Sequence, residues 1–365
     1  MGRVLVTASA LAISASASWA GGLERSAQSM SILFETGTYA EFSLGFADPD
    51  VSGTLGGVFS SGNMLGSYNT VTLGYKQQLG DNLDVAIILD QPIGADIDYP
   101  ATAPYPLAGT NAEVDSMALT GLLRYKLPSN FSVYGGLRLE SVEGQVNIRT
   151  VPPVSPIAID YALQTNRDYQ AGYVIGVAWE KPEIAARIAL TYNSAITHSL
   201  EMSETSNITA PSVVRQDVEI PQSVNLEFQT GIAADTLLFG SVRWVDWTAF
   251  VIAPPVYDGI YGPRPLVSYQ SDRVTYNLGL GRKFNETWSG AVTVSYEPSN
   301  GDITGNLGPT DGFTSVGLAA TYTRDNMKIT GGVRYIKVGG ATTTLGADFS
   351  DNDAIGAGLR VAYSF

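Results

Sequence analysis

The sequence predicts an all-β protein, a transmembrane antiparallel β-barrel of about 14 strands with a short N-terminal plug. Three observations predict this fold. Apolar and polar residues alternate with a period of two in one segment after another. No stretch after Gly21 has the run of about 18 apolar residues that a membrane-spanning helix needs. The last strand also alternates, and it ends in Phe365.

The composition excludes several classes of protein. With 44% hydrophobic and 15% charged residues, the chain is too apolar to be disordered. Its formal net charge of −14 leaves no basic face for nucleic acid, because phosphate binding depends on clustered Lys and Arg. The 365 residues include no cysteine and one histidine, which excludes thiolate zinc sites, iron–sulfur clusters and multi-histidine metal sites. We expect no metal and no cofactor.

Residues 1–20 have the pattern of a secretory signal peptide. A positive charge at Arg3 precedes a modest apolar stretch, and the small residues Ser18 and Ala20 precede the expected cut. A first membrane-spanning helix is the alternative, but the stretch is short and interrupted by Ser and Thr. The sequence thus predicts export, with residues 21–38 as a short plug and residues 39–365 as the barrel.

The alternation is clearest where both faces of a strand can be compared. Between Met117 and Leu127, odd-numbered positions carry Met, Leu, Gly or Tyr, whereas even-numbered positions include Thr120, Arg124 and Lys126. The same pattern predicts strands near 39–47, 66–79, 83–93, 114–127, 131–148, 168–180, 184–201, 218–233, 236–248, 272–284, 287–297, 312–323, 327–338 and 353–365.

The breaks between these strands alternate between short and long. Short breaks such as 127–130 and 323–326 alternate with long polar ones such as 96–113, 149–167 and 249–271. Short turns at one rim and long loops at the other are typical of an outer-membrane barrel. We therefore expect both termini on the periplasmic side.

Two features favour this barrel over a secreted β-sandwich or propeller. The face opposite the apolar one is rich in Gly, Ser, Thr and isolated charges, whereas a sandwich or propeller needs a second apolar set. Tyr363 and Phe365 form a terminal aromatic pattern that resembles the signal read by the bacterial barrel-assembly machinery. We expect a multi-pass monomer of the bacterial outer membrane that contacts membrane lipid and lipopolysaccharide.

Several motifs occur in a specific order along the chain. A Pro-led strand begins at Ile220–Val224 and is followed by Ser241–Phe250, whose sequence is SVRWVDWTAF. Asp90–Ala95 places Pro and Gly inside a strand, and Gly301–Thr304 and Gly308–Gly312 precede the closing strands. Over nearly the whole mature chain, this order resembles the FadL family of outer-membrane transporters for long-chain fatty acids and aromatic hydrocarbons.

The resemblance implies passive uptake of hydrophobic molecules, with long-chain fatty acids as the first expectation and aromatic hydrocarbons as the second. It also implies that the chain is not an enzyme. One departure concerns the plug. Family members have a longer plug with an Asn-Pro-Ala turn, whereas here Gly21–Thr38 is short and lacks that tripeptide.

The predicted strand number leaves a lumen that must be occupied. Barrels of eight strands are filled by side chains, and those of 16 to 18 strands enclose an aqueous channel. The N-terminal segment is available to occupy an intermediate lumen, and Leu33 and Phe34 make it apolar. We interpret these two residues as ligand-binding. An unstructured leader is the alternative.

Pro92 and Gly94 predict an interruption of the third strand. Proline cannot donate to a ladder and glycine weakens a strand interior, so both favour bulges and strand ends. By resemblance to the family, this kink is a lateral opening through which an apolar solute passes into the bilayer. The alternative is that the strand ends near Leu89 and a loop begins.

Several arginines fall on the polar face by alternation, and Arg138 is our candidate for binding a fatty-acid carboxylate. Pairing with lumen acids such as Glu140 is the alternative. The others are Arg124, Arg273, Arg334 and Arg360.

Two rival functions belong to other classes. Catalysis would rest on His198, but the neighbouring Ser199 points to the opposite face of the strand, so we interpret His198 as a rim residue. A porin for small polar solutes would have a charged lumen and a constriction loop. The acidic loops, with Asp48, Asp96 and Asp351 among their residues, lack the spacing of a calcium loop.

Overall fold

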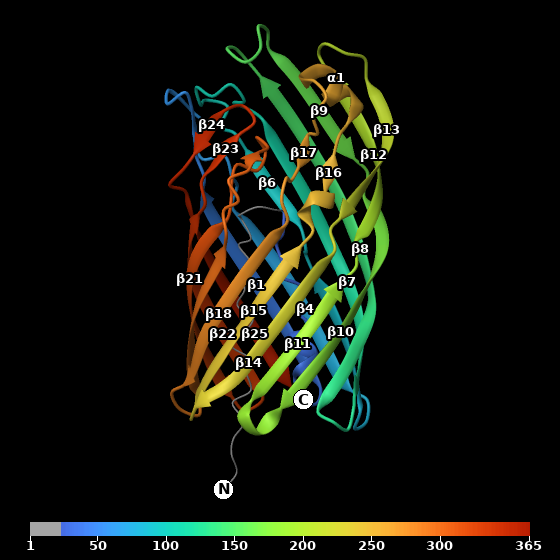
Figure 1. Cartoon of the computed structure of the whole chain (residues 1–365), viewed down its shortest axis with the longest axis vertical. Helices are drawn as coiled ribbons and strands as arrows, with labels where there is room; N and C mark the ends of the chain where they lie inside the picture. Colours follow the sequence, from blue (N-terminus) through green and yellow to red (C-terminus); the bar gives the residue numbers. More distant parts are fainter. Residues whose placement is uncertain (1–22) are drawn as a thin grey trace.

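A computed structural model describes residues 23–365 as an antiparallel barrel (Figure 1). The predicted signal peptide lies outside the described residues. The sheet closes on itself because β1 (Tyr39–Asp50) pairs with β25 (Asp353–Ser364) on one side and with β4 (Tyr68–Gln78) on the other. This pairing joins the first strand to the last, as a membrane-spanning β-structure requires.

Within residues 23–365, the main sheet has 18 segments, and four of its strands each consist of two consecutive segments, which leaves 14 strands. The predicted fold class is therefore confirmed. The remaining segments are β5 (Leu83–Asp90) with β6 (Gly94–Asp98), β7 (Asn111–Lys126), β8 (Phe131–Thr150), β9 (Ile159–Thr165) with β10 (Asp168–Lys181), β11 (Ala186–Asn193) with β12 (Ile196–Ser206), β13 (Ser212–Ile220) with β14 (Ser223–Ala233), β15 (Thr236–Val245), β18 (Arg273–Lys283), β19 (Trp288–Glu297), β21 (Phe313–Arg324) and β22 (Met327–Val338).

The burial pattern matches a barrel in lipid. Along β7, Leu119 and Leu123 are 46% and 57% exposed on the outer face, whereas Ala118, Thr120 and Leu122 are buried on the lumen face. This exposure suits lipid contact, because the outer wall of such a barrel is an apolar band. No helix among residues 23–365 is long and apolar enough to cross a membrane.

Some strands extend further than the alternation predicts. The region 149–167, expected as a loop, contains β9, and the region 202–217 contains the end of β12 and the start of β13. There the outward positions are polar, as at Thr197 and Glu201, so the apolar face that marks a strand in lipid is missing.

The long connections cover the barrel at the end opposite the C-terminus (Figure 1). One group forms a small sheet, and another contains the helix α1 (Pro255–Tyr261). The elements of this region are β2 (Thr54–Leu55), β3 (Phe59–Ser60), β20 (Ile303–Thr304), β23 (Ala341–Thr343) and β24 (Ala347–Phe349) in the small sheet, and η4 (Trp247–Ala249), β16 (Val251–Ile252) and β17 (Val267–Ser268) beside α1. The single-turn η3 (Pro182–Ile184) lies in a short turn at the other end.

Residues 23–38, which we call the lumen segment, run inside the barrel and contain η2 (Ser31–Phe34). Leu33 is fully buried, and its carbonyl accepts a hydrogen bond of 3.0 Å from Arg124 Nη1. The Phe34 ring lies 4.4 Å from the guanidinium carbon of Arg124 and 4.4 Å from that of Arg187. Met30 and Leu33 pack with wall residues from five strands, namely Ala86, Ile88, Leu122, Val174, Ala189 and Ala362. The segment therefore occupies part of the lumen and packs against the inner face of the wall.

Candidate functional site

The wall is interrupted between β4 and the third strand. The ladder between β4 and β5 ends at the pair Leu73 and Leu89, and within the described chain Tyr68–Thr72 have no ladder partner in β5 or β6. On the β7 side the register changes by one residue, because Asp90 faces Ala118 whereas Gly94 faces Asp115. Strand three thus contains a one-residue bulge and resumes as β6, so it does not end near Leu89.

The lumen segment takes the place that β4 leaves open. The N–H of Gly94 donates to the carbonyl of Leu23 at 2.8 Å, and the N–H of Arg25 donates to the carbonyl of Pro92 at 2.8 Å. The N–H of Ser26 also donates to Pro92, at 3.3 Å. Because an unpaired backbone group in lipid costs several kcal/mol, these bonds are what make the interruption tolerable.

Pro92 and Gly94 suit this arrangement for different reasons. Pro92 has no N–H to leave unpaired, and its carbonyl accepts two bonds from the lumen segment. A Cβ atom on Gly94 would lie 2.5 Å from Nε and Cζ of Arg25, so the glycine permits close approach of that side chain. We call the region of residues 90–94 the wall interruption.

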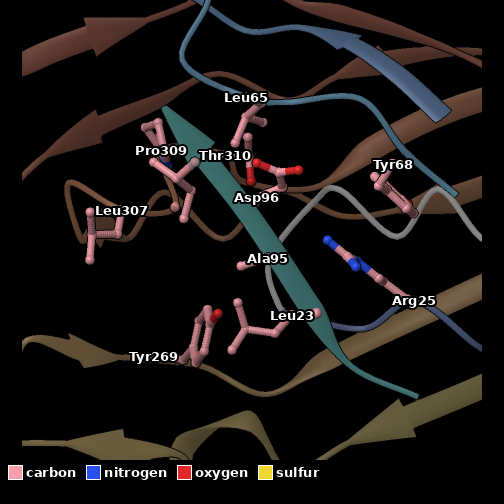
Figure 2. A pocket seen from close by; sticks show the side chains of 13 residues that line it. Leu23, Arg25, Leu65, Tyr68, Ala95, Asp96, Tyr269, Leu307, Pro309 and Thr310 are labelled. Atoms are coloured by element: carbon pink, nitrogen blue, oxygen red, sulfur yellow. The ribbon is translucent and has the colours of Figure 1, made fainter. Parts of the chain in front are cut away.

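A cavity of about 60 Å³, the inner cavity, lies directly beside the wall interruption (Figure 2). Its lining is largely apolar, with Arg25 and Asp96 as its charged residues. The guanidinium carbon of Arg25 lies 4.3 Å from the centre of the Tyr68 ring. The lining residues are Leu23, Arg25, Leu65, Tyr68, Gly94, Ala95, Asp96, Ile97, Tyr269, Leu307, Gly308, Pro309 and Thr310.

A larger cavity of about 490 Å³, the outer pocket, lies among the long connections. It is lined by residues of α1 and of the loops around Leu107, Val154, Arg264 and Leu345, and it shares Leu307 with the inner cavity. The rings of Tyr257 and Tyr261 lie 4.8 Å apart in its wall. Burial raises the pKa of Tyr257 to about 12, and Arg264 is the charged residue in the lining of this pocket.

Arg138 does not line either cavity. It is buried in the wall, where Nε donates to Thr120 Oγ1 at 3.1 Å and Nη2 donates to Asn193 Oδ1 at 3.2 Å. Other arginines on the polar face form ion pairs: Arg124 with Glu180, Arg243 with Glu24, Arg273 with Asp311 and Arg360 with Glu41. These four arginines are therefore paired with acidic residues, as in the alternative given above for the arginines of the polar face.

Leu33 and Phe34 lie at the floor of the lumen and line neither the inner cavity nor the outer pocket. Their contact with a ligand stays a prediction. Tyr363 and Phe365 lie at the periplasmic end of β25, with ring centres 4.9 Å apart, and Phe365 N–H donates to the carbonyl of Thr38 at 2.9 Å. Their role in assembly also stays a prediction.

The prediction of His198 as a rim residue is wrong. His198 is fully buried on the lumen face, with Nδ1 3.1 Å from Asp168 and Nε2 3.7 Å from Glu140. The reason is that β12 continues to Ser206, so His198 lies within the strand and not at its end. Ser199 is on the other face, as expected from alternation.

Sequence reasoning missed most of the cavity lining. Leu23, Arg25, Tyr68, Tyr269 and Leu307 come from distant parts of the chain, and most of them lie outside regular strands. The alternation pattern cannot identify residues in loops. The one local signal was the Pro and Gly of the wall interruption.

Comparison with known proteins places the chain among outer-membrane transport proteins. Residues 34–302 match the family model described as outer membrane protein transport protein (OMPP1/FadL/TodX). No curated protein matches significantly. Three solved structures share the fold: a Pseudomonas aeruginosa FadL homologue at 14% identity, the Pseudomonas putida toluene transporter TodX at 13% and the Ralstonia pickettii toluene transporter TbuX at 13%.

The structural similarity extends over nearly the whole of each protein. The TM-scores are 0.77, 0.64 and 0.61 in that order. The alignments cover 92% of this chain in all three cases, and 92%, 92% and 91% of the other chains.

Proposed function

Because this chain belongs to the OMPP1/FadL/TodX family of outer-membrane transporters of hydrophobic compounds, we propose that it takes up long-chain fatty acids through an opening in its wall. Aromatic hydrocarbons are the second candidate cargo. TodX and TbuX are toluene transporters, which supports that alternative equally. In this family the barrel is a passive channel of the outer membrane and not an enzyme.

The succession of cavities supports this route. The outer pocket and the inner cavity share Leu307, and the inner cavity adjoins the wall interruption. Below them, Leu33 and its neighbours close the lumen. A solute that enters from outside therefore meets a closed floor and, beside it, a wall segment without a β4 ladder.

The size of the inner cavity implies movement. About 60 Å³ holds only a few water-sized groups, which is too small for an acyl chain. A cargo must displace the loop around Leu307 and part of the lumen segment. Residues 23–26 are suited to this, because backbone bonds to Pro92 and Gly94 replace a continuous ladder there.

The energetics allow the route without a coupled energy source. Apolar surface moves from water into hydrocarbon with a gain of roughly 25 cal/mol per Å². A sideways exit spares an apolar cargo the aqueous periplasm. Long-chain fatty acids and small aromatic hydrocarbons both satisfy this argument, so measurement must decide between them.

Deleting Pro92 tests the proposed exit. The bulge adds one residue to strand three, so a substitution at Pro92 or Gly94 leaves the register offset in place, whereas the deletion removes it. We expect β6 to continue the ladder with β4 and the uptake of oleate and toluene to fall. Heat-modifiable migration on a denaturing gel controls for assembly. Unchanged uptake by an assembled deletion variant would exclude the wall interruption as the exit.

A further inference from the structure

We propose that Arg25 determines specificity by binding the carboxylate of a fatty acid in the inner cavity, a role that rests on the proposed function. Arg138, the arginine expected for this role, is held in the wall by Thr120 and Asn193. Arg25 instead belongs to the lumen segment, and it is the cation among the lining residues of the inner cavity.

The surroundings of Arg25 leave its donors available. Within residues 23–365, its guanidinium has a ring contact with Tyr68, but the structure contains no hydrogen bond from it and no ion pair within 4 Å. Figure 2 shows the side chain extending between Tyr68 and the strand that carries Asp96. A guanidinium in an apolar cavity binds a carboxylate strongly, because two parallel charge-assisted hydrogen bonds can form.

The volumes of the two cavities fit the carboxylate head group in the inner cavity and the acyl tail in the outer pocket. About 60 Å³ suits a carboxylate, and Leu307 lies between this space and the outer pocket of about 490 Å³, so the loop around Leu307 must move for the tail to extend into that pocket. The apolar side chains Leu65, Tyr269 and Leu307 would contact the first methylenes. An aromatic hydrocarbon has no group that can use Arg25, so this residue would favour anionic amphiphiles over neutral cargo.

Asp96 is the competitor for Arg25. Its carboxylate packs against Gly66 and faces the same cavity, where the charge of Arg25 acts on it. A bound fatty acid would compete with Asp96 for the guanidinium. The Asp96→Asn variant should therefore bind a fatty acid more tightly, but only while Arg25 is present.

Equilibrium binding to the protein in lipid nanodiscs tests the proposal with two probes of equal chain length, palmitate and the uncharged hexadecanol. We expect Arg25→Gln to weaken palmitate binding about 10- to 100-fold and to leave hexadecanol binding within about twofold. Arg25→Lys should retain part of the palmitate affinity, because it keeps the charge but loses the planar fork. Arg324→Gln, which removes an exposed charge at the end of β21 and lines neither cavity, is the matched control and should change neither.

The outcomes separate the two proposals. Equal weakening of both probes in Arg25→Gln would show that Arg25 only holds the lumen segment in place, which overturns the assignment. Unchanged palmitate binding would overturn it as well while leaving the proposed function intact. If the unmodified protein binds neither probe, the proposed function fails, and the assignment fails with it.

Discussion

A disulfide between positions 24 and 93 should lock the wall interruption shut. Glu24 and Ile93 form an isolated antiparallel bridge, flanked by the bonds from Gly94 to Leu23 and from Arg25 to Pro92. In such a non-hydrogen-bonded pair the Cα atoms are about 4.5 Å apart, which lies within the range of a disulfide. The chain has no cysteine of its own, so Glu24→Cys with Ile93→Cys forms a single defined pair.

The magnitude of the effect follows from the bonds that hold the lumen segment. Three backbone hydrogen bonds join residues 23–26 to Pro92 and Gly94. At about 1 kcal/mol each, their release costs about 3 kcal/mol, which corresponds to an open fraction of roughly 1 in 150. A disulfide removes this fraction, so oxidation should reduce uptake at least about tenfold.

The assay is uptake of labelled oleate by cells that lack an endogenous fatty-acid channel, compared before and after a reductant. The reduced double variant should regain the rate of the cysteine-free protein. The Glu24→Cys single variant controls for loss of the contact between Glu24 and Arg243, and the Ile93→Cys single variant controls for loss of the isoleucine side chain. If the oxidised variant takes up oleate as fast as the reduced one, the lumen segment does not need to leave the wall interruption, and the reasoning is refuted.

Three further predictions concern the pathway, the loops and assembly. Leu307 separates the two cavities, so Leu307→Trp should hinder passage between them and reduce uptake of oleate and toluene alike, whereas Leu307→Ala should not. Equal rates in both variants would exclude a route past Leu307. Burial acts to raise the pKa of Asp311, but bonds from Ser299, Asn300, Arg273 and Gly301 outweigh it and hold the pKa below its usual value. The ionised form of Asp311 therefore stabilises the loop at neutral pH, and this contribution disappears as the pH falls below about 4. Below that pH, proteolysis of the loop should become faster in the unmodified protein. It should not become faster in Asp311→Asn, because this variant has already lost the contribution. Phe365→Ala should lower the yield of heat-modifiable barrel in the outer membrane, with Phe284→Ala, an exposed aromatic in a turn, as the control; equal yields would contradict a role for the terminal aromatic.

The barrel itself was predictable because its signal is local. An outward residue such as Leu119 or Leu137 contacts lipid, and its neighbour in sequence faces the lumen. The alternation of apolar and polar residues within each strand therefore identifies the strand. The signal weakens where a strand rises above the membrane, and this is why β9 and the end of β12 were expected as loops. The same limit placed His198 at a strand end.

The site could be predicted only where a residue changes the backbone by itself. Pro92 and Gly94 interrupt a ladder whatever surrounds them, so the sequence alone indicates the wall interruption. Only the tertiary structure decides which residues bond to the backbone at the wall interruption. Leu23 and Arg25, which form these bonds, lie about seventy positions away in a segment with no regular pattern. The same holds for Arg25 and Arg138. Alternation puts Arg138 on the lumen face, but only the packing of separate strands and loops decides which guanidinium is bonded to its neighbours and which one borders the inner cavity.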